Sequence, residues 1–247
     1  MPRKQRTDTD EQSYLAAYDA SRYPRPSVAV DVVLLTVADD QLHVLLARRP
    51  EQPQLGKWAL PGTFLGMDES IDATAARALR TKTGLEDIFI EQLYTFGEPG
   101  RDPRTRVISV AYYALVEPAR LQEAVARHAD AGLRLARVSD DALPVDDHDT
   151  PLPMAFDHAS IVAQAIERIR GKLSYAPIGF ELLGGTFTLR DLRRVHQAIL
   201  GRELNKDSFR RTILDRGLVT ATGEVLTGVG HRPPALYRFS GGDRGVS

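Results

Sequence analysis

The sequence predicts an α+β protein in which a mixed β-sheet flanked by helices is followed by a smaller, mainly helical module. Two observations predict this order. Runs of aliphatic and β-branched residues alternate with a helical pattern up to about residue 150, which is typical of a sheet covered by helices. Beyond the acidic, proline-rich segment 139–153, the spacing of apolar residues becomes mainly helical.

The composition of the chain narrows the possible classes of protein. The 247 residues include 43% hydrophobic residues, enough to bury a core. The chain has no cysteine, which excludes disulfides, thiol catalysis and zinc ribbons and fits a reducing compartment. We find neither a signal peptide nor an apolar run long enough to span a membrane, so we expect a cytoplasmic protein that does not contact membranes.

The net charge of −1 hides an asymmetry between the two parts of the chain. Residues 154–247 carry 14 Lys and Arg against 9 Asp and Glu, whereas residues 1–153 carry 18 against 24. A basic C-terminal part weakly favours a module that binds nucleic acid.

The first part of the chain begins with a polar segment, residues 1–26, which we expect to be a tail. Residues 28–37 and 42–47 predict a hairpin of buried strands because they are continuous aliphatic runs separated by the turn residues ADDQ. Residues 70–83 predict a helix, which should end at Gly84.

Two more strands are predicted on either side of a loop that contains three arginines. Residues 89–96 and 107–116 are rich in aromatic and β-branched residues, and the sequence GEPGRDPRTR between them is typical of a turn. Together with the first hairpin and the helix, these strands predict a mixed core with a strand–loop–helix element.

The segment LPGTFLGMDESIDATAARALRTKTGL, from Leu60 to Leu85, resembles the Nudix box, G-x5-E-x7-R-E-U-x-E-E-x-G-U, where U is bulky and aliphatic. The matching positions are Glu69, Arg77, Leu79, Gly84 and Leu85. Thr63 replaces the opening glycine, and the three helix glutamates of the pattern are replaced by Ala78, Thr81 and Lys82.

The missing glutamates determine what chemistry we expect of the box. Carboxylates at positions i, i+3 and i+4 share one helix face and can together hold divalent cations that activate water. Without them we expect no metal site, no required cofactor and no hydrolysis, although a pocket for a pyrophosphate can remain. One hypothesis is that Lys82 supplies the positive charge of the absent metal; the alternative is a solvated surface lysine.

The candidate ligand-binding residues come from the box, from the end of the second strand and from the arginine loop. They are Arg48, Arg49, Trp58, Phe64, Glu69, Arg77, Lys82, Arg101, Arg104 and Arg106. Arginine suits phosphate because its planar fork donates two parallel hydrogen bonds, and the alternative is an exposed loop arginine that binds nothing. Trp58 either stacks on a ligand or only wedges the turn, and Glu69 and Arg77 are expected to pair and shape the loop.

The C-terminal part has the element order of a winged helix-turn-helix. Helices are predicted over 157–173, 188–200 and 205–216, and strands over 218–226 and 235–239. The second helix should begin with a capping box formed by Thr188 and Asp191, and Asn205 should cap the third.

The third of these helices is expected to enter the DNA major groove, with the wing reaching the backbone or the minor groove. The candidate DNA-binding residues are Lys172, Asn205, Lys206, Ser208, Arg210, Arg211, His231 and Arg232. The alternative is a three-helix dimerisation or accessory domain with a solvated basic face.

The whole chain resembles the NrtR family of Nudix-related transcriptional regulators. The resemblance is strongest in MAFDHASIV from Met154, GKLSYAPIGFELL from Gly171, FTLRDLRRVHQAILGRELNKDSFRRTIL from Phe187, HRPPALYRF from His231 and GEPGRDPRTRVISVAYYALV from Gly97. It implies a Nudix-type mixed-sheet α/β/α sandwich over residues 27–150 and a winged helix-turn-helix domain over residues 154–240.

The resemblance also implies a function. Its members are homodimeric repressors of NAD-metabolism genes that leave a palindromic double-stranded DNA operator when ADP-ribose binds the Nudix domain. Two alternatives stay open: an ADP-ribose hydrolase with an atypical metal site, and a regulator of the same architecture that responds to a sugar-type ligand.

Overall fold

The computed structural model describes residues 8–128, 132–227 and 233–241. Within these residues, eight strands form a sheet with the order β5-β6-β1-β2-β7-β8, in which β3 pairs with β2 and β4 pairs with β1. The strands are β1 Ser27–Ala38, β2 Gln41–Arg48, β3 Trp58–Ala59, β4 Gly62–Phe64, β5 Glu91–Phe96, β6 Val107–Leu115, β7 Leu133–Val138 and β8 Pro144–Val145. Because β1 lies parallel to β6 and antiparallel to β2, the sheet is mixed, as predicted.

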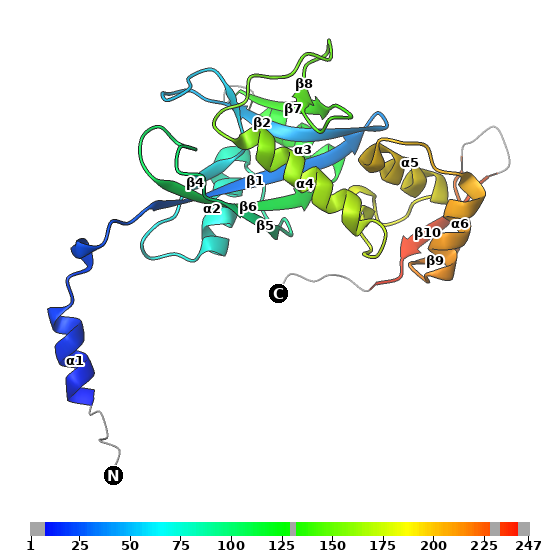
Figure 1. Cartoon of the computed structure of the whole chain (residues 1–247). Helices are drawn as coiled ribbons and strands as arrows, with labels where there is room; N and C mark the ends of the chain where they lie inside the picture. The colour runs from blue at the N-terminus through cyan, green and yellow to red at the C-terminus, as the bar shows by residue number, and fades with distance from the viewer. Residues whose placement is uncertain (1–7, 129–131, 228–232, 242–247) are drawn as a thin grey trace.

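Helices cover both faces of this sheet (Figure 1). The helices are α2 Ile71–Thr83 and α3 Pro118–Arg127 on one face and α4 His158–Lys172 on the other. Alternate residues of β1 separate the two cores: Val32 and Leu34 pack with α2 and α3, whereas Val33 and Leu35 pack with α4. The predicted α/β/α sandwich is therefore present.

The predicted box helix and hairpin are confirmed in their positions. Ser70 caps α2 by accepting a hydrogen bond from the backbone N–H of Ala73, and Gly84 ends the helix in the left-handed region at φ 67°. Gly62 in β4 is needed for a different reason: a Cβ there would lie 2.6 Å from the carbonyl oxygen of Val30. The chain before the box can therefore approach β1 closely.

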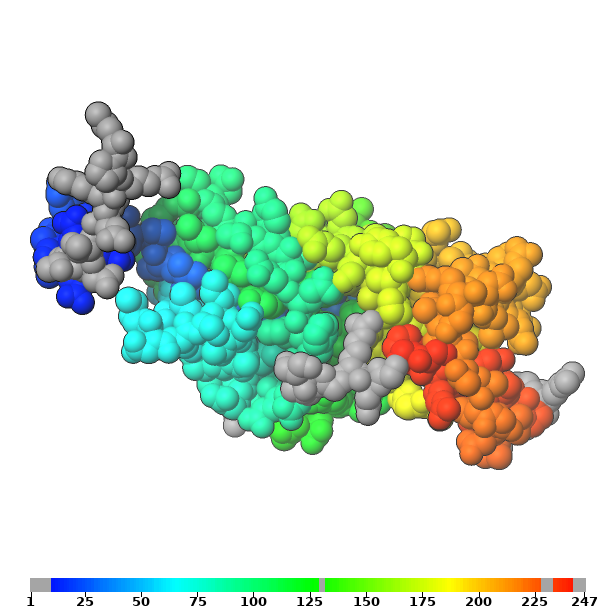
Figure 2. Space-filling view, turned by 90° about the horizontal axis from the view of Figure 1, so that it is seen from below, coloured from blue at the N-terminus to red at the C-terminus, as the bar shows by residue number. Residues whose placement is uncertain are grey.

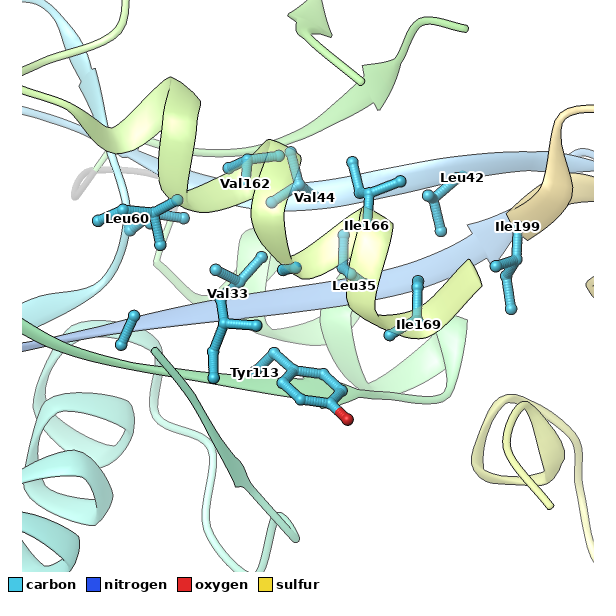
Figure 3. Close-up of a cluster of buried hydrophobic side chains, with 14 of the residues drawn as sticks. Val33, Leu35, Leu42, Val44, Leu60, Tyr113, Val162, Ile166, Ile169 and Ile199 are labelled. Atoms are coloured by element: carbon cyan, nitrogen blue, oxygen red, sulfur yellow. The ribbon is translucent and has the colours of Figure 1, made fainter. Parts of the chain in front are cut away.

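The placement of α4 differs from the expectation that this helix belongs with the C-terminal module. Its apolar face packs on β1 and β2 in one cluster that also includes Ile199 of the next helix (Figure 3). The apolar spacing of a helix shows that one face is buried but does not show which surface buries it. The domain boundary that we predicted before Met154 therefore assigns α4 to a different domain from the sheet on which it packs.

The C-terminal module consists of a short 3-10 turn, two helices and a hairpin. These elements are Phe180–Leu182, α5 Leu189–Leu200, α6 Lys206–Asp215, β9 Val219–Val225 and β10 Ala235–Phe239. A separate core holds them together and is formed by Phe180, Phe187, Leu192, Ile213, Val219 and Tyr237. The predicted capping box of Thr188 and Asp191 is present.

The N-terminal segment is not simply a tail, because α1 Asp8–Ala17 is helical. This helix stands away from the sheet (Figure 1), and the C-terminal module lies at the opposite end of the molecule (Figure 2). No helix in the described ranges is long and apolar enough to cross a membrane.

Candidate functional site

The loop that leads into α2 is held by the predicted pair of Glu69 and Arg77. Arg77 forms a salt bridge with both carboxylate oxygens of Glu69, donates from Nη1 to the Thr63 hydroxyl at 3.2 Å and donates from Nη2 to the Phe64 carbonyl at 2.9 Å. Glu69 also accepts from the Gly66 backbone N–H at 2.7 Å. The Arg77 hydrogen bonds, with that of Gly66, lower the pKa of Glu69 to about 2, so it is ionised at neutral pH.

The helix positions where the Nudix pattern has glutamates do not form a cluster of carboxylates. Ala78 is fully buried, whereas Thr81 and Lys82 are exposed. The Thr81 hydroxyl donates to the Arg77 carbonyl at 2.7 Å. In the described part of the chain, no group of three or more His, Cys, Asp or Glu residues could hold a metal ion. The residues present do not fit the metal that the Nudix pattern implies.

Next to the box, arginine and aromatic side chains from four segments come together. Arg104 lies over the Phe64 ring, with 5.4 Å from its guanidinium carbon to the ring centroid, and at 5.9 Å from that of Phe156. The Arg49 guanidinium carbon lies 4.8 Å from the centroid of Phe156. Asp102 holds Arg104 through two hydrogen bonds, at 3.0 Å and 2.7 Å. Flat cationic and aromatic groups in one place suit a ligand with both phosphate and a planar ring.

In this cluster of arginine and aromatic side chains, both the pKa of Arg49 and the backbone conformation of Phe156 depart from their usual values. Burial, with the positive charge of Arg104, lowers the pKa of Arg49. Phe156 has φ 51°, in the left-handed region that favours glycine, and its N–H donates to the side chain of Gln54 at 3.0 Å. A bulky residue in that conformation is strained, and such strain is typical of functional sites.

Behind the cluster lies a network of buried charges. Arg101 donates to both carboxylate oxygens of Asp157, at 2.8 Å and 2.6 Å, and lies 3.6 Å from Asp31. Its side chain is only 5% exposed. Burial opposes the charge of Arg101, but the two carboxylates outweigh it and raise its pKa. Arg101 is therefore engaged within the protein and does not point freely into a pocket.

His158 completes this network from the first residue of α4. Its Nδ1 accepts the Leu60 backbone N–H at 2.9 Å, and its Nε2 lies 3.6 Å from Asp31. Since Nδ1 accepts, the neutral ring carries its proton on Nε2. Burial lowers the pKa of His158, with Asp31 acting in the opposite direction.

Three further predicted ligand residues lie outside the cluster of arginine and aromatic side chains. Arg48 donates to the Gly56 carbonyl at 3.1 Å, and Arg106 is exposed beside the start of β1. Trp58 pairs through its backbone with Pro153 and Ala155, and its half-buried ring packs on the α4 core. These contacts agree with a structural role for Trp58 in the turn before the box.

At the other end of the molecule, α6 presents a basic surface. Asn205 accepts from the backbone N–H groups of Asp207 and Ser208, so its side chain is used to cap the helix. Ile213 is buried, whereas the side chains on the outer surface are exposed: Lys206, Ser208, Arg210 and Arg211. Lys206 and Arg210 lie in the first half of the helix, the part that reads bases in helix-turn-helix proteins, and Arg211 follows directly.

Lys172, which we expected to contact DNA, is engaged within the protein. Its ammonium contacts Glu91 at 2.5 Å and the Tyr113 hydroxyl at 3.2 Å, and its side chain is 17% exposed. Lys172 thus fixes the end of α4 to the sheet, although Glu91 and Tyr113 are distant from it in the sequence. His231 and Arg232, predicted in the wing, lie outside the described residues.

Four residues that the structure places in or beside this site were not predicted from the sequence: Asp31, Asp102, Phe156 and His158. A signal was present for Asp31, since a lone carboxylate in the aliphatic run VAVDVVLLTV must find a partner when buried. No such signal was present for Phe156, Asp157 and His158. They lie in the segment MAFDHASIV that resembles the NrtR family, but no residue near them in the sequence shows that they pack beside the arginine loop.

Comparisons with known proteins match both parts of the chain. The family model described as NUDIX domain matches residues 25–165, and the model described as NrtR DNA-binding winged helix domain matches residues 179–239. The chain is 35% identical over 234 residues to the "ADPR responsive transcriptional repressor NtrR" of Acinetobacter baylyi, covering 94% of this chain and 89% of that protein.

Solved structures give the same match. The crystal structure of Shewanella oneidensis NrtR complexed with a 27mer DNA is 36% identical with a TM-score of 0.74, covering 86% of this chain and 93% of that chain. The NUDIX domain of the same protein, complexed with ADP ribose, is 33% identical with a TM-score of 0.50, covering 64% of this chain and 98% of that chain.

Proposed function

This chain belongs to the NrtR family, in which a Nudix domain precedes a DNA-binding winged helix, and from this premise we propose that it is a transcriptional repressor released from its operator by ADP-ribose. The observation that carries the proposal is the joining, in one chain, of a Nudix box that lacks the three helix glutamates of the pattern to a winged helix whose α6 exposes basic residues. The first part can bind a nucleotide diphosphate, and the second can bind DNA.

In the Nudix domain, we assign ligand binding to the loop before α2 and to the cluster of Arg49, Phe64, Arg104 and Phe156. Arg104 and Arg49 offer planar forks to the diphosphate, and the two phenylalanines offer ring faces to the base or the ribose. The Glu69–Arg77 pair holds the loop between β4 and α2, and Arg77 also donates to the carbonyl of Phe64 at the end of β4. This domain binds ADP-ribose without hydrolysing it, because the helix lacks the groups that would hold a catalytic metal.

In the winged helix, Lys206, Arg210 and Arg211 contact DNA. Arginine can bind guanine through two hydrogen bonds, while lysine contacts guanine or phosphate. The protein acts as a homodimer, so that two copies of α6 meet two half-sites of a palindrome about one turn of DNA apart. The genes it controls belong to NAD metabolism, whose products include the nucleotide that releases the repressor.

Release requires that ADP-ribose bind two arrangements of the dimer with different affinity. A ligand that binds both arrangements equally changes no population, however tightly it binds. By thermodynamic linkage, operator DNA must then weaken the binding of ADP-ribose by the same factor.

The proposal is tested by selecting bound fragments from sheared genomic DNA at fixed salt, with and without ADP-ribose. Salt is held constant because phosphate contacts make the affinity steeply salt-dependent. We expect enrichment of a palindrome beside NAD-metabolism genes, lost when ADP-ribose is added. A palindrome indifferent to ADP-ribose would leave a regulator that responds to another ligand, such as a sugar. If no sequence is enriched, release of AMP from ADP-ribose in the presence of metal would favour a hydrolase.

A further inference from the structure

Helix α4 connects the ligand side of the Nudix domain to the winged helix. With 15 residues it spans roughly 22 Å. It lies across the sheet from the end of β2 to α5 (Figure 1). In Figure 3, Leu60 marks one end of its apolar contacts and Ile199 of α5 marks the other.

The first turn of α4 is fixed to the ligand loop by buried charges. Asp157, the N-cap residue, makes no cap hydrogen bond with its side chain and instead accepts both hydrogen bonds from Arg101. The next residue, His158, receives the N–H of Leu60, just before the box. The position of this turn is therefore set by the same two segments that carry Arg104 and Phe64.

The last turn of α4 is fixed to the DNA-binding part. Arg170 donates from Nε to the carbonyl of Ile199 at 2.8 Å, and Ile166 and Ile169 lie in the same core as Ile199. Helix α5 in turn contacts α6 through His196, whose ring meets Phe209 edge-on at 5.1 Å between centroids. Helices α4, α5 and α6 are therefore linked by direct contacts.

Arg101 is buried, but along the chain it is next to the residues of the ligand cluster. It is separated by only two residues from Arg104, and its partner Asp157 directly follows Phe156, which Arg49 and Arg104 contact. A diphosphate at this cluster offers Arg101 the same two-point acceptor as Asp157 does. A buried guanidinium needs a charged partner, so a diphosphate that displaces Asp157 could take its place, which would give two discrete states.

We propose that the Arg101–Asp157 ion pair is the contact through which ligand binding is transmitted to the DNA-binding helices. This inference rests on the proposed function. In the DNA-bound state, Arg101 holds the first turn of α4. When the diphosphate takes Arg101, Asp157 and the first turn of α4 are released, and the helix shifts against α5. Asp157 is thus a positioning residue that acts on DNA binding through α4.

The test uses the full-length protein and the substitution Asp157→Asn, which keeps the shape of the side chain but removes its charge. Operator affinity is measured by fluorescence anisotropy with and without saturating ADP-ribose, and ADP-ribose affinity is measured by calorimetry. For the unaltered protein we expect ADP-ribose to weaken operator binding about tenfold or more. For Asp157→Asn, which releases the first turn of α4 without a ligand, we expect operator binding to be already weakened about tenfold and ADP-ribose binding to be tighter, and the further weakening of operator binding by ADP-ribose to fall below about twofold.

A matched control is Asp147→Asn, which removes a carboxylate from the exposed pair of Asp147 and Arg134 at 3.0 Å. In this control, ADP-ribose should weaken operator binding as much as it does in the unaltered protein. Arg170→Met tests the contact at the opposite end of α4 independently, and it tests transmission through α4 if Asp157→Asn does not fold. It removes the hydrogen bond to Ile199 and should also reduce the response.

The outcomes separate this inference from the proposed function. A normal response in a folded Asp157→Asn would overturn the role of the ion pair, and a normal response in Arg170→Met would overturn the transmission through α4 on which that role depends; either result would leave the repressor intact. If the unaltered protein binds its operator equally with and without ADP-ribose, the proposed function fails and the inference fails with it.

Discussion

His196 makes the DNA-binding module sensitive to acid, and replacing it should remove that sensitivity. The residue lies in α5, is 7% exposed and packs against Phe209 of α6. Its Nε2 is buried, and among the described residues no atom forms a hydrogen bond with it. Burial, with a smaller contribution from Arg216, lowers the pKa of His196 from 6.5 to about 4.

The sign of the effect follows from linkage. Below pH 6.5 the unfolded chain binds a proton at His196 that the folded protein does not bind, so the free energy of unfolding decreases as the pH falls. Each pH unit removes about 1.4 kcal/mol until the folded pKa is reached, which gives about 3 kcal/mol between pH 6.5 and pH 4. Leucine has a similar volume and cannot be protonated.

The assay is urea unfolding followed by circular dichroism at pH 7 and at pH 4.5, for the unaltered protein and for His196→Leu. We expect the unaltered protein to lose about 2–3 kcal/mol more than the variant over this range. The exposed His148, replaced by leucine, serves as a control and should keep the original pH dependence. Equal pH dependence in His196→Leu and the unaltered protein would refute the reasoning.

Three other predictions concern the core, the ligand site and the DNA surface. Ile166→Ala removes a fully buried side chain between α4 and the sheet and should lower the free energy of unfolding by about 2–5 kcal/mol, measured with urea; a loss below about 1 kcal/mol would contradict this packing. Arg104→Ala should weaken ADP-ribose binding in calorimetry about tenfold and leave operator affinity unchanged, because it removes one charged phosphate contact; unchanged ADP-ribose affinity would exclude that contact. Lys206→Ala and Arg210→Ala should each weaken operator binding. Each should also reduce the slope of the logarithm of the operator binding constant against the logarithm of salt concentration by about one; an unchanged slope would place these side chains away from phosphate.

The features that could be predicted from the sequence are those specified by neighbours along the chain. Asn205 and the Thr188–Asp191 pair cap their helices within three residues, and Glu69, just before α2, pairs with Arg77, eight residues later in that helix. The apolar runs of β1 and β2 likewise predict a buried hairpin. In each case the physical cause is local, so the residue types and their spacing are sufficient.

The features that could not be predicted depend on contacts between distant segments. Arg101 and Asp157 are 56 residues apart, and Lys172 and Glu91 are 81 residues apart. An arginine on a polar loop and a lysine at a helix end both look solvent-exposed in sequence, and only the packing of α4 on the sheet buries them. For the same reason, the sequence pattern alone assigned α4 to the C-terminal module, whereas its apolar face packs on the sheet.

The central claim is that ADP-ribose and operator DNA bind the same protein with opposite effects. It is tested most directly by calorimetric titration of ADP-ribose into the full-length protein, alone and saturated with operator duplex, at the same salt. The account predicts that operator weakens ADP-ribose binding by the same factor by which ADP-ribose weakens operator binding. Equal affinity for ADP-ribose with and without the operator would contradict it.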